Sequence, residues 1–235
     1  PWAEAREALR KNYGIEAQAE AGPALQRAQI VVWAVKPQTF RDAAAQAKAH
    51  TQGALHLSVA AGIRSDSIAQ WLGTERIVRT MPNTPALVGK GMSALYARPA
   101  VSAPERQSIE AIMATTGEFL WVDSEPQLDA VTALSGSGPA YVFYFLEAMT
   151  RAGTDMGLTA AQAHQLAVGT FVGASELARR SDETPAVLRQ RVTSKGGTTY
   201  AALQSMEHDA VAEKFMQAMQ AARQRAHELG DEFGK

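Results

Sequence analysis

An apolar run closed by a lysine and a proline lies near the start of the chain: Ile30-Val31-Val32-Trp33-Ala34-Val35-Lys36-Pro37. Because the run is polar on neither face, it is typical of a parallel strand that helices cover on both sides. Further strands are expected at 54–59, 76–80, 92–96 and 118–122, and helices at 38–49, 65–72 and 103–116. This strand–helix alternation predicts a doubly wound α/β sheet.

Helix signals frame this part of the chain. A helix is expected over 2–13 and should end at Gly14, and Ser102 with Glu105 forms a capping-box pattern before another helix. From Glu125 onward the strand patterns stop. Helices are expected at 126–135, 138–155, 160–180, 185–192, 198–206 and 209–229, the last closing at Gly230. The sequence therefore predicts an α/β domain over 1–124 and an all-helical domain over 125–235.

The expected helices 138–155 and 160–180 are apolar around most of their circumference, so they should be buried on nearly all sides. A helical segment of this length can hardly enclose two such helices alone. We therefore expect a second subunit to supply the missing cover, as in an intertwined dimer. The alternative is a compact bundle packed on the α/β domain.

Composition excludes several classes of function. The chain has 235 residues, 46% of them hydrophobic, and its 23 basic residues nearly balance 24 acidic ones, which does not favour nucleic acid as a partner. It has no cysteine, so disulfides and thiolate chemistry are absent and a reducing, cytoplasmic location is expected. The five histidines show no metal-ligand spacing, so no metal is expected. Neither a membrane-spanning run nor a signal peptide is visible.

Four polar clusters are candidates for chemistry. Ala34–Pro37 and Ser58–Gly62 follow expected strands, where open α/β sheets bind ligands, although a solvated lysine and a tight turn are plain alternatives. Arg79–Pro85 is a loop stiffened by two prolines. Val192–Thr199 carries hydroxyls and glycines at a helix start, where backbone N–H groups suit a carboxylate. Ser135–Pro139 follows a helix, so close helix packing fits it better than a dinucleotide fingerprint.

Together these clusters resemble the pyrroline-5-carboxylate reductase family over essentially the whole chain. The segments AVKP, SVAAG, MPNTP and LSGSGPAY occur in the family's order and spacing. The most specific portion is 185–207. Its matching positions are Leu188, Val192-Thr193-Ser194, Gly196-Gly197, Thr199, Ala202-Leu203 and Met206-Glu207.

The resemblance implies a Rossmann-type domain that binds NADPH or NADH, and a helical domain that forms interleaved homodimers, often assembled into decamers. The implied reaction is hydride transfer to the C=N bond of 1-pyrroline-5-carboxylate, giving L-proline. The implied cofactor-binding residues are Ala34, Val35, Lys36, Pro37, Val59, Ala61 and Asn83, the last of which, with its loop, would face the nicotinamide. The implied substrate-binding residues are Ser194, Gly197, Thr198, Thr199, Glu125 and Asp182, where the family more often has Glu at the last. Thr199 Oγ1 would reach the ring nitrogen and act in catalysis.

The chain also departs from the family. It contains no G-x-G-x-x-G turn, and relative to the family pattern roughly 30 residues, one strand–turn–helix unit, are expected before Pro1. One alternative is therefore a truncated, catalytically impaired oligomerisation module. Another is a different reductase of the hydroxyacid dehydrogenase group. Those enzymes place a catalytic lysine on the helix that opens the second domain, and 138–155 contains none.

Overall fold

The computed structural model describes residues 2–234, and the chain divides into two compact units. One unit runs to Gly136 and takes in the chain again from Ala222 onward, and the other comprises Ser137–Ala221. This division differs from the predicted boundary between residues 124 and 125. The reason is that α5 (Gln127–Val131) packs against the sheet, where its Leu128 is buried.

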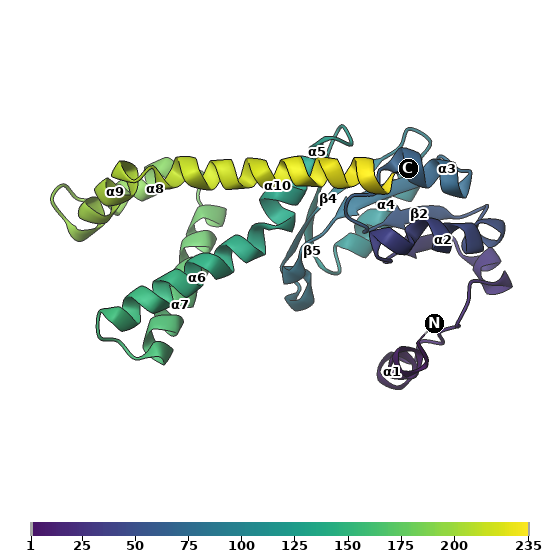
Figure 1. Cartoon of the computed structure of the whole chain (residues 1–235), viewed down its shortest axis with the longest axis horizontal. Coiled ribbons are helices and arrows are strands. Elements are labelled where there is room, and N and C mark those ends of the chain that lie inside the picture. Colours follow the sequence, from purple (N-terminus) through teal and green to yellow (C-terminus); the bar gives the residue numbers. More distant parts are fainter. Residues whose placement is uncertain (1, 235) are drawn as a thin grey trace. The chain divides into compact units, whose positions relative to one another are not determined.

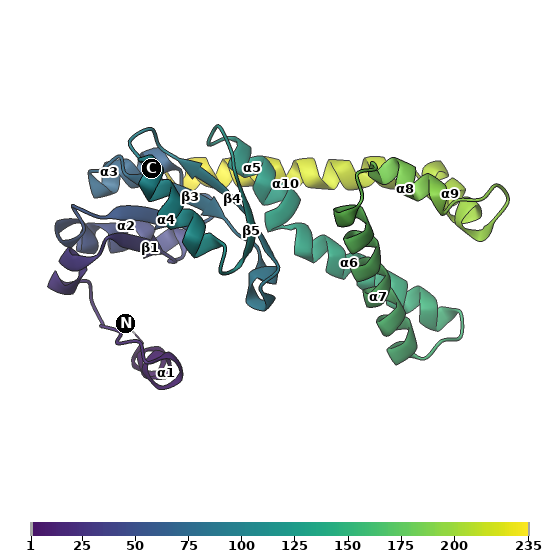
Figure 2. The same cartoon turned by 180° about the vertical axis from the view of Figure 1, so that it is seen from behind.

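The first unit is built on a sheet with the order β1-β2-β3-β4-β5, whose strands are labelled between Figure 1 and Figure 2. Its strands are β1 (Ile30–Trp33), β2 (Leu55–Ser58), β3 (Ile77–Met81), β4 (Gly91–Ala97) and β5 (Gly117–Trp121). β1, β2 and β3 run parallel, β4 runs antiparallel to β3, and β5 is parallel to β4. The predicted fold class is confirmed. The reversal at β4, which was not predicted, follows from a connection that holds only the short 3₁₀ turn η3 (Thr84–Val88) and no crossover helix.

Helices cover both faces of this sheet (Figure 1 and Figure 2). α2 (Pro37–Ala47) and α3 (Ser65–Leu72) bury Phe40 and Ile68 with Trp33 and Ile77 on one face. On the other face α4 (Ala103–Met113) packs on a second core. That core contains Leu55, Leu57, Val78, Leu95, Ala97, Val101, Ile109 and Met113. The two cores hold the carboxyl ends of β1 and β2 in register.

Cover on both faces is complete for β2 and incomplete for β1. Every residue of β2 is buried, whereas β1 is the first strand in the sheet order and its Val32 is 51% exposed. β1 also ends at Trp33, so Ala34 and Val35 belong to the loop that follows it. The apolar run therefore supplies both a strand and the start of a loop.

Helix ends in this unit follow the predicted signals. α1 (Ala3–Tyr13) ends at Gly14, which adopts a left-handed φ of 66°. The capping box before α4 is present, because Ser102 N–H donates to Glu105 Oε2 at 2.8 Å and Ser102 Oγ to the same atom at 2.7 Å. Short 3₁₀ turns, η1 (Pro23–Arg27) and η2 (Lys48–His50), precede β1 and β2.

The second unit is helical. α6 (Gly138–Asp155) and α7 (Ala160–Arg180) pack against each other, and a Cβ on Gly153 would lie 2.7 Å from the Ala163 Cβ. α8 (Pro185–Arg191) and α9 (Thr198–His208) follow. The first part of α10 (Val211–Phe233) packs on α6, where the Phe215 ring lies 5.5 Å from that of Tyr141.

The predicted end of the last helix at Gly230 is wrong, since α10 continues to Phe233. Gly230 lies against Arg64, and a Cβ there would come within 2.8 Å of the Arg64 Nε. Arg64 then pairs with Asp231 at 2.9 Å. The glycine therefore permits a close approach inside a helix and does not terminate it.

The apolar surface of α6 and α7 is largely uncovered within a single chain. Tyr144 is 70% exposed, and Val172 on α7 is 65% exposed. One chain therefore does not bury α6 and α7 on nearly all sides. The expectation that a second subunit covers them requires this exposed surface. Among residues 2–234, no helix is both long enough and apolar enough to cross a bilayer.

A buried histidine lies in the first core. His56 on β2 is 1% exposed, and its Nδ1 accepts a hydrogen bond from Trp33 Nε1 at 2.9 Å. Burial lowers the pKa of His56 to about 4, from an ordinary value of 6.5. The folded chain therefore holds this imidazole neutral at physiological pH.

We expect His56 to make the fold sensitive to acid. The unfolded chain binds the proton at higher pH than the folded chain, so stability is full above pH 6.5 and falls as the pH drops towards 4. The size of the pKa difference corresponds to about 3 kcal/mol. Urea unfolding across this pH range should show that the free energy of unfolding depends less on pH in His56→Asn than in the wild type. Asparagine keeps an acceptor for Trp33, and His164→Asn, at an exposed position, serves as the control. Equal slopes for wild type and His56→Asn would contradict the assignment.

Candidate active site

The two loops predicted to line a cofactor lie side by side at one edge of the sheet. Trp33 pairs with Ser58 in the parallel register, and the Val59 N–H donates to the Trp33 carbonyl at 3.1 Å. The loop Ala34–Pro37 therefore starts beside Val59, at the carboxyl ends of two neighbouring parallel strands. In open α/β sheets this edge is where ligands bind.

The two loops leave the sheet by different turns. Lys36 is the N-cap of α2 and makes no capping hydrogen bond with its side chain, while Pro37 occupies the first turn. After β2, the Ala60 N–H donates to Ser58 Oγ at 3.3 Å, which turns the chain towards Ala61. Ala34 and Ala61 are the small, partly accessible side chains at this edge.

Asn83, the third predicted cofactor residue, follows β3, and its amide group is used within the protein. Its Oδ1 accepts from the Met92 N–H at 2.9 Å, and its Nδ2 donates to the Ser135 carbonyl at 3.1 Å. The side chain therefore ties its own loop to β4 and to a π-helical turn, η4 (Thr132–Gly136).

Glu125 lies in the first unit and is also engaged. Its Oε1 accepts from the Arg79 guanidinium at 2.7 Å and from the Ser65 N–H at 2.5 Å, and its Oε2 accepts from Ser65 Oγ. Arg79 is 7% exposed. The carboxylate thus joins the middle of β3 to the first turn of α3, where the helix dipole favours negative charge.

Arg79 and Ser65 were not singled out individually by the sequence. The available signal was an arginine, the one charged residue of the strand Ile77–Met81, because a buried charge needs a partner. Ser65 Oγ also accepts from Arg98 Nη1 at 3.1 Å, and Arg98 pairs with Glu75 at 2.6 Å. Two arginines and three acidic side chains therefore form one network, with Asp66 as its last member.

The predicted carboxylate-binding loop lies in the helical unit and opens α9. Gly196 has a φ of 76°, and Gly197 is the N-cap of α9, so no side chain caps the helix. A Cβ on Gly197 would come within 2.7 Å of Ser194 Oγ. Ser194, Thr198 and Thr199 are all exposed residues, and the last two open the helix. A helix start of this kind leaves donors for an anion.

Asp182 lies in the exposed turn between α7 and α8. The structure therefore groups Ala34–Pro37 with Val59 and Ala61 in one unit, and Ser194 with Gly197–Thr199 in the other. Glu125 and Asn83 belong to the first unit and are bound to protein atoms. In the described part of the chain, no group of three or more His, Asp and Glu side chains is arranged to hold a metal ion.

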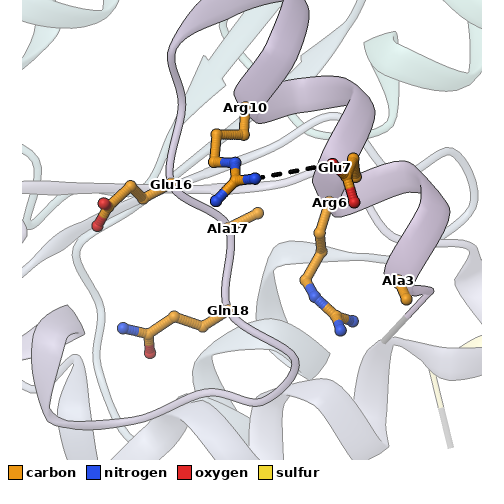
Figure 3. Close-up of a pocket in the computed structure, with 7 residues that line it drawn as sticks. All are labelled: Ala3, Arg6, Glu7, Arg10, Glu16, Ala17 and Gln18. Carbon is orange, nitrogen blue, oxygen red and sulfur yellow. Dashed lines mark ion pairs between the residues drawn. The ribbon is translucent and has the colours of Figure 1, made fainter.

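A separate cavity lies at α1 and contains none of the predicted site residues (Figure 3). Its volume is about 380 Å³. Arg6, Glu7 and Arg10 line it from the helix, with Glu16 and Gln18 from the extended segment that follows. Arg10 pairs with Glu7 at 3.7 Å, and both side chains are largely exposed. These are solvated charges of both signs, so the cavity does not define a ligand.

Two family models match the chain. Residues 125–229 match the model described as pyrroline-5-carboxylate reductase dimerisation. Residues 2–62 match the model described as NADP oxidoreductase coenzyme F420-dependent. The two matches fall on the helical part and on the cofactor part of the chain.

Curated proteins and solved structures agree with these models. A pyrroline-5-carboxylate reductase of Pseudomonas aeruginosa is 42% identical, over 100% of this chain and 87% of its own length. That of Arabidopsis thaliana is 34% identical over 93% and 79%. The structure from Coxiella burnetii has a TM-score of 0.90 at 35% identity and covers 97% of this chain and 86% of its own. The Plasmodium falciparum structure, solved with NADP bound, has a TM-score of 0.86 at 29% identity over 93% and 84%.

Proposed function

The chain belongs to the pyrroline-5-carboxylate reductase family, and from that premise we infer that it reduces 1-pyrroline-5-carboxylate to L-proline with NAD(P)H. The observation that carries this is the likeness to reductases over the whole chain, in both the cofactor and the helical parts. It is an oxidoreductase of proline biosynthesis that acts on a C=N bond.

We propose that Ala34, Val35, Lys36, Pro37, Val59 and Ala61 hold the cofactor. These residues fit a dinucleotide: they lie at the carboxyl ends of parallel strands, their side chains are mostly small, and the start of α2 has no side-chain cap. The Lys36 ammonium supplies positive charge for an anionic cofactor. NAD(P)H, when bound, supplies the hydride.

We propose that the start of α9 holds the substrate carboxylate. The backbone N–H groups of Thr198 and Thr199 donate to it together with Ser194 Oγ, and Gly197 leaves room for it because it carries no Cβ. Glu125 and Asp182 are proposed as acidic groups near the substrate. Glu125 would have this role in addition to its hydrogen bonds with Arg79 and Ser65.

In the reaction the imine carbon gains a hydride and the ring nitrogen gains a proton. A protonated imine is strongly electrophilic. Orientation and charge therefore supply most of the rate enhancement, and no strong general acid is needed. We propose that Thr199 Oγ1 forms a hydrogen bond with the ring nitrogen and so prevents the ring from rotating. Functionally, this assigns cofactor binding to residues 1–124, and substrate binding and subunit contact to residues 125–235.

The protein is an oligomer that acts on a small-molecule substrate. We propose that its basic form is a homodimer, further assembled into a decamer. Support for the dimer comes from the apolar surface of α6 and α7, where Tyr144 and Val172 stay largely exposed in one chain. A cytoplasmic location is also proposed, because a chain without cysteine suits a reducing compartment.

Replacing Thr199 with alanine should lower kcat/KM by about 10- to 100-fold, the value of a hydrogen bond to a charged partner. The measurement is NAD(P)H oxidation at 340 nm with pyrroline-5-carboxylate as substrate. Thr199→Ser keeps the hydroxyl and should retain most of the activity. An unchanged kcat/KM for the alanine variant would remove Thr199 from the mechanism.

A further inference from the structure

Asn83 occupies a helix-capping position without capping. It is the N-cap of η3, and asparagine at such a position usually bonds the first N–H groups of its own helix. Here its side chain makes no such bond. The amide group is directed instead to two other segments of the same unit.

The two bonds of Asn83 use both ends of its amide. Oδ1 accepts from the Met92 N–H on β4, and Nδ2 donates to the Ser135 carbonyl in η4. One end faces a donor and the other an acceptor, so the orientation of the amide is determined by its partners. A single half-buried side chain thus joins three segments: the loop after β3, the start of β4, and η4.

The joined turn η4 is itself unusual. A π-helical turn is rare, and such turns occur frequently at functional sites. Its hydroxyls donate to carbonyls of the preceding helix α5, since Thr132 Oγ1 donates to the Leu128 carbonyl at 2.7 Å. Met81, two residues before Asn83, also lies against it, because a Cβ on Gly136 would come within 2.5 Å of the Met81 Cε. The loop and the turn therefore meet at two points.

We propose that Asn83 is a positioning residue for hydride transfer and not a ligand of the nicotinamide. It holds the loop Met81–Pro85 against η4, so that this loop presents one constant surface at the carboxyl end of β3. This inference rests on the proposed function. Asn83 acts on the cofactor through this loop, and not by the direct contact that the family resemblance implies.

The test is Asn83→Asp in the full chain. Aspartate is isosteric and keeps the acceptor for the Met92 N–H, but it loses the donor and sets a carboxylate against the Ser135 carbonyl. We expect kcat to fall about tenfold or more, because small displacements of reacting groups are costly. The Kd of NADPH should stay within about twofold. The primary isotope effect on kcat with deuterated NADPH should rise as hydride transfer becomes slower.

A cofactor fragment separates positioning from direct contact. 2′-Phospho-ADP-ribose lacks the nicotinamide ring. If Asn83 contacted that ring directly, Asn83→Asp would weaken binding of NADPH and leave binding of this fragment unchanged. That result would overturn the proposal, as would an unchanged kcat. Leu87→Ala, in the same 3₁₀ turn at an 89% exposed position, is the matched control and should behave as wild type.

A measurement on the unmutated protein covers the case of a variant that does not fold. If the two bonds are present, the Met92 amide should exchange its hydrogen slowly, and rapid exchange would overturn the proposal. The proposed function fails separately, by the absence of any NAD(P)H oxidation in the wild type with pyrroline-5-carboxylate.

Discussion

Replacing Arg79 with methionine should lower the free energy of unfolding by about 3–5 kcal/mol. The Arg79 and Glu125 side chains are only 8% and 16% exposed, and Arg79 Nη1 lies 2.7 Å from Glu125 Oε1. Methionine fills much of the same space but leaves the carboxylate without its cationic partner. Ser65 alone cannot offset the cost of holding that charge away from water. Urea unfolding at neutral pH measures the loss.

A more exposed pair in the same unit provides the control. Arg10 pairs with Glu7, and the two side chains are 71% and 73% exposed, so Arg10→Met should cost about 1 kcal/mol or less. The double variant Arg79→Met/Glu125→Gln removes both charges and should be more stable than Arg79→Met alone. Equal losses of unfolding free energy for Arg79→Met and Arg10→Met would mean that burial does not determine how much the Arg79–Glu125 pair contributes to stability.

Local patterns were sufficient for most elements of the fold. The apolar run from Ile30 places β1, and the Ser102–Glu105 capping box places the start of α4, because each signal lies within a few residues of the element it predicts. Gly14 ends α1 for the same reason. The misjudged glycine, Gly230, has a role set by Arg64, which lies far away in the sequence.

The contacts that shape the site could not be predicted in the same way. The Arg79–Glu125 pair and the Asn83–Ser135 bond join residues 46 and 52 positions apart, and neither has a local signature. A polar residue at a strand end is expected to face a ligand, yet Asn83 uses its amide inside the protein. The strand-end rule predicts the place of a loop, but not which of its atoms remain available.

Replacing Gly197 with alanine should lower kcat/KM by about 100-fold, although the substitution adds only one methyl group. A Cβ at this position would lie 2.7 Å from Ser194 Oγ and 3.2 Å from the Ser194 carbonyl oxygen. The Gly197 N–H also donates to that carbonyl at 3.0 Å, so the loop cannot move away without losing a bond. Ser194 and the first N–H groups of α9 would then no longer converge on one carboxylate.

The loss should appear mainly as a raised KM for pyrroline-5-carboxylate, because the carboxylate is bound in both the ground state and the transition state. The Kd of NADPH should not change, since the proposed cofactor residues belong to the other unit. Gly53→Ala is the matched exchange, as nothing lies within 4 Å of a Cβ there, and it should keep wild-type kinetics. If Gly197→Ala kept its kcat/KM within about twofold, the start of α9 would not be the carboxylate site.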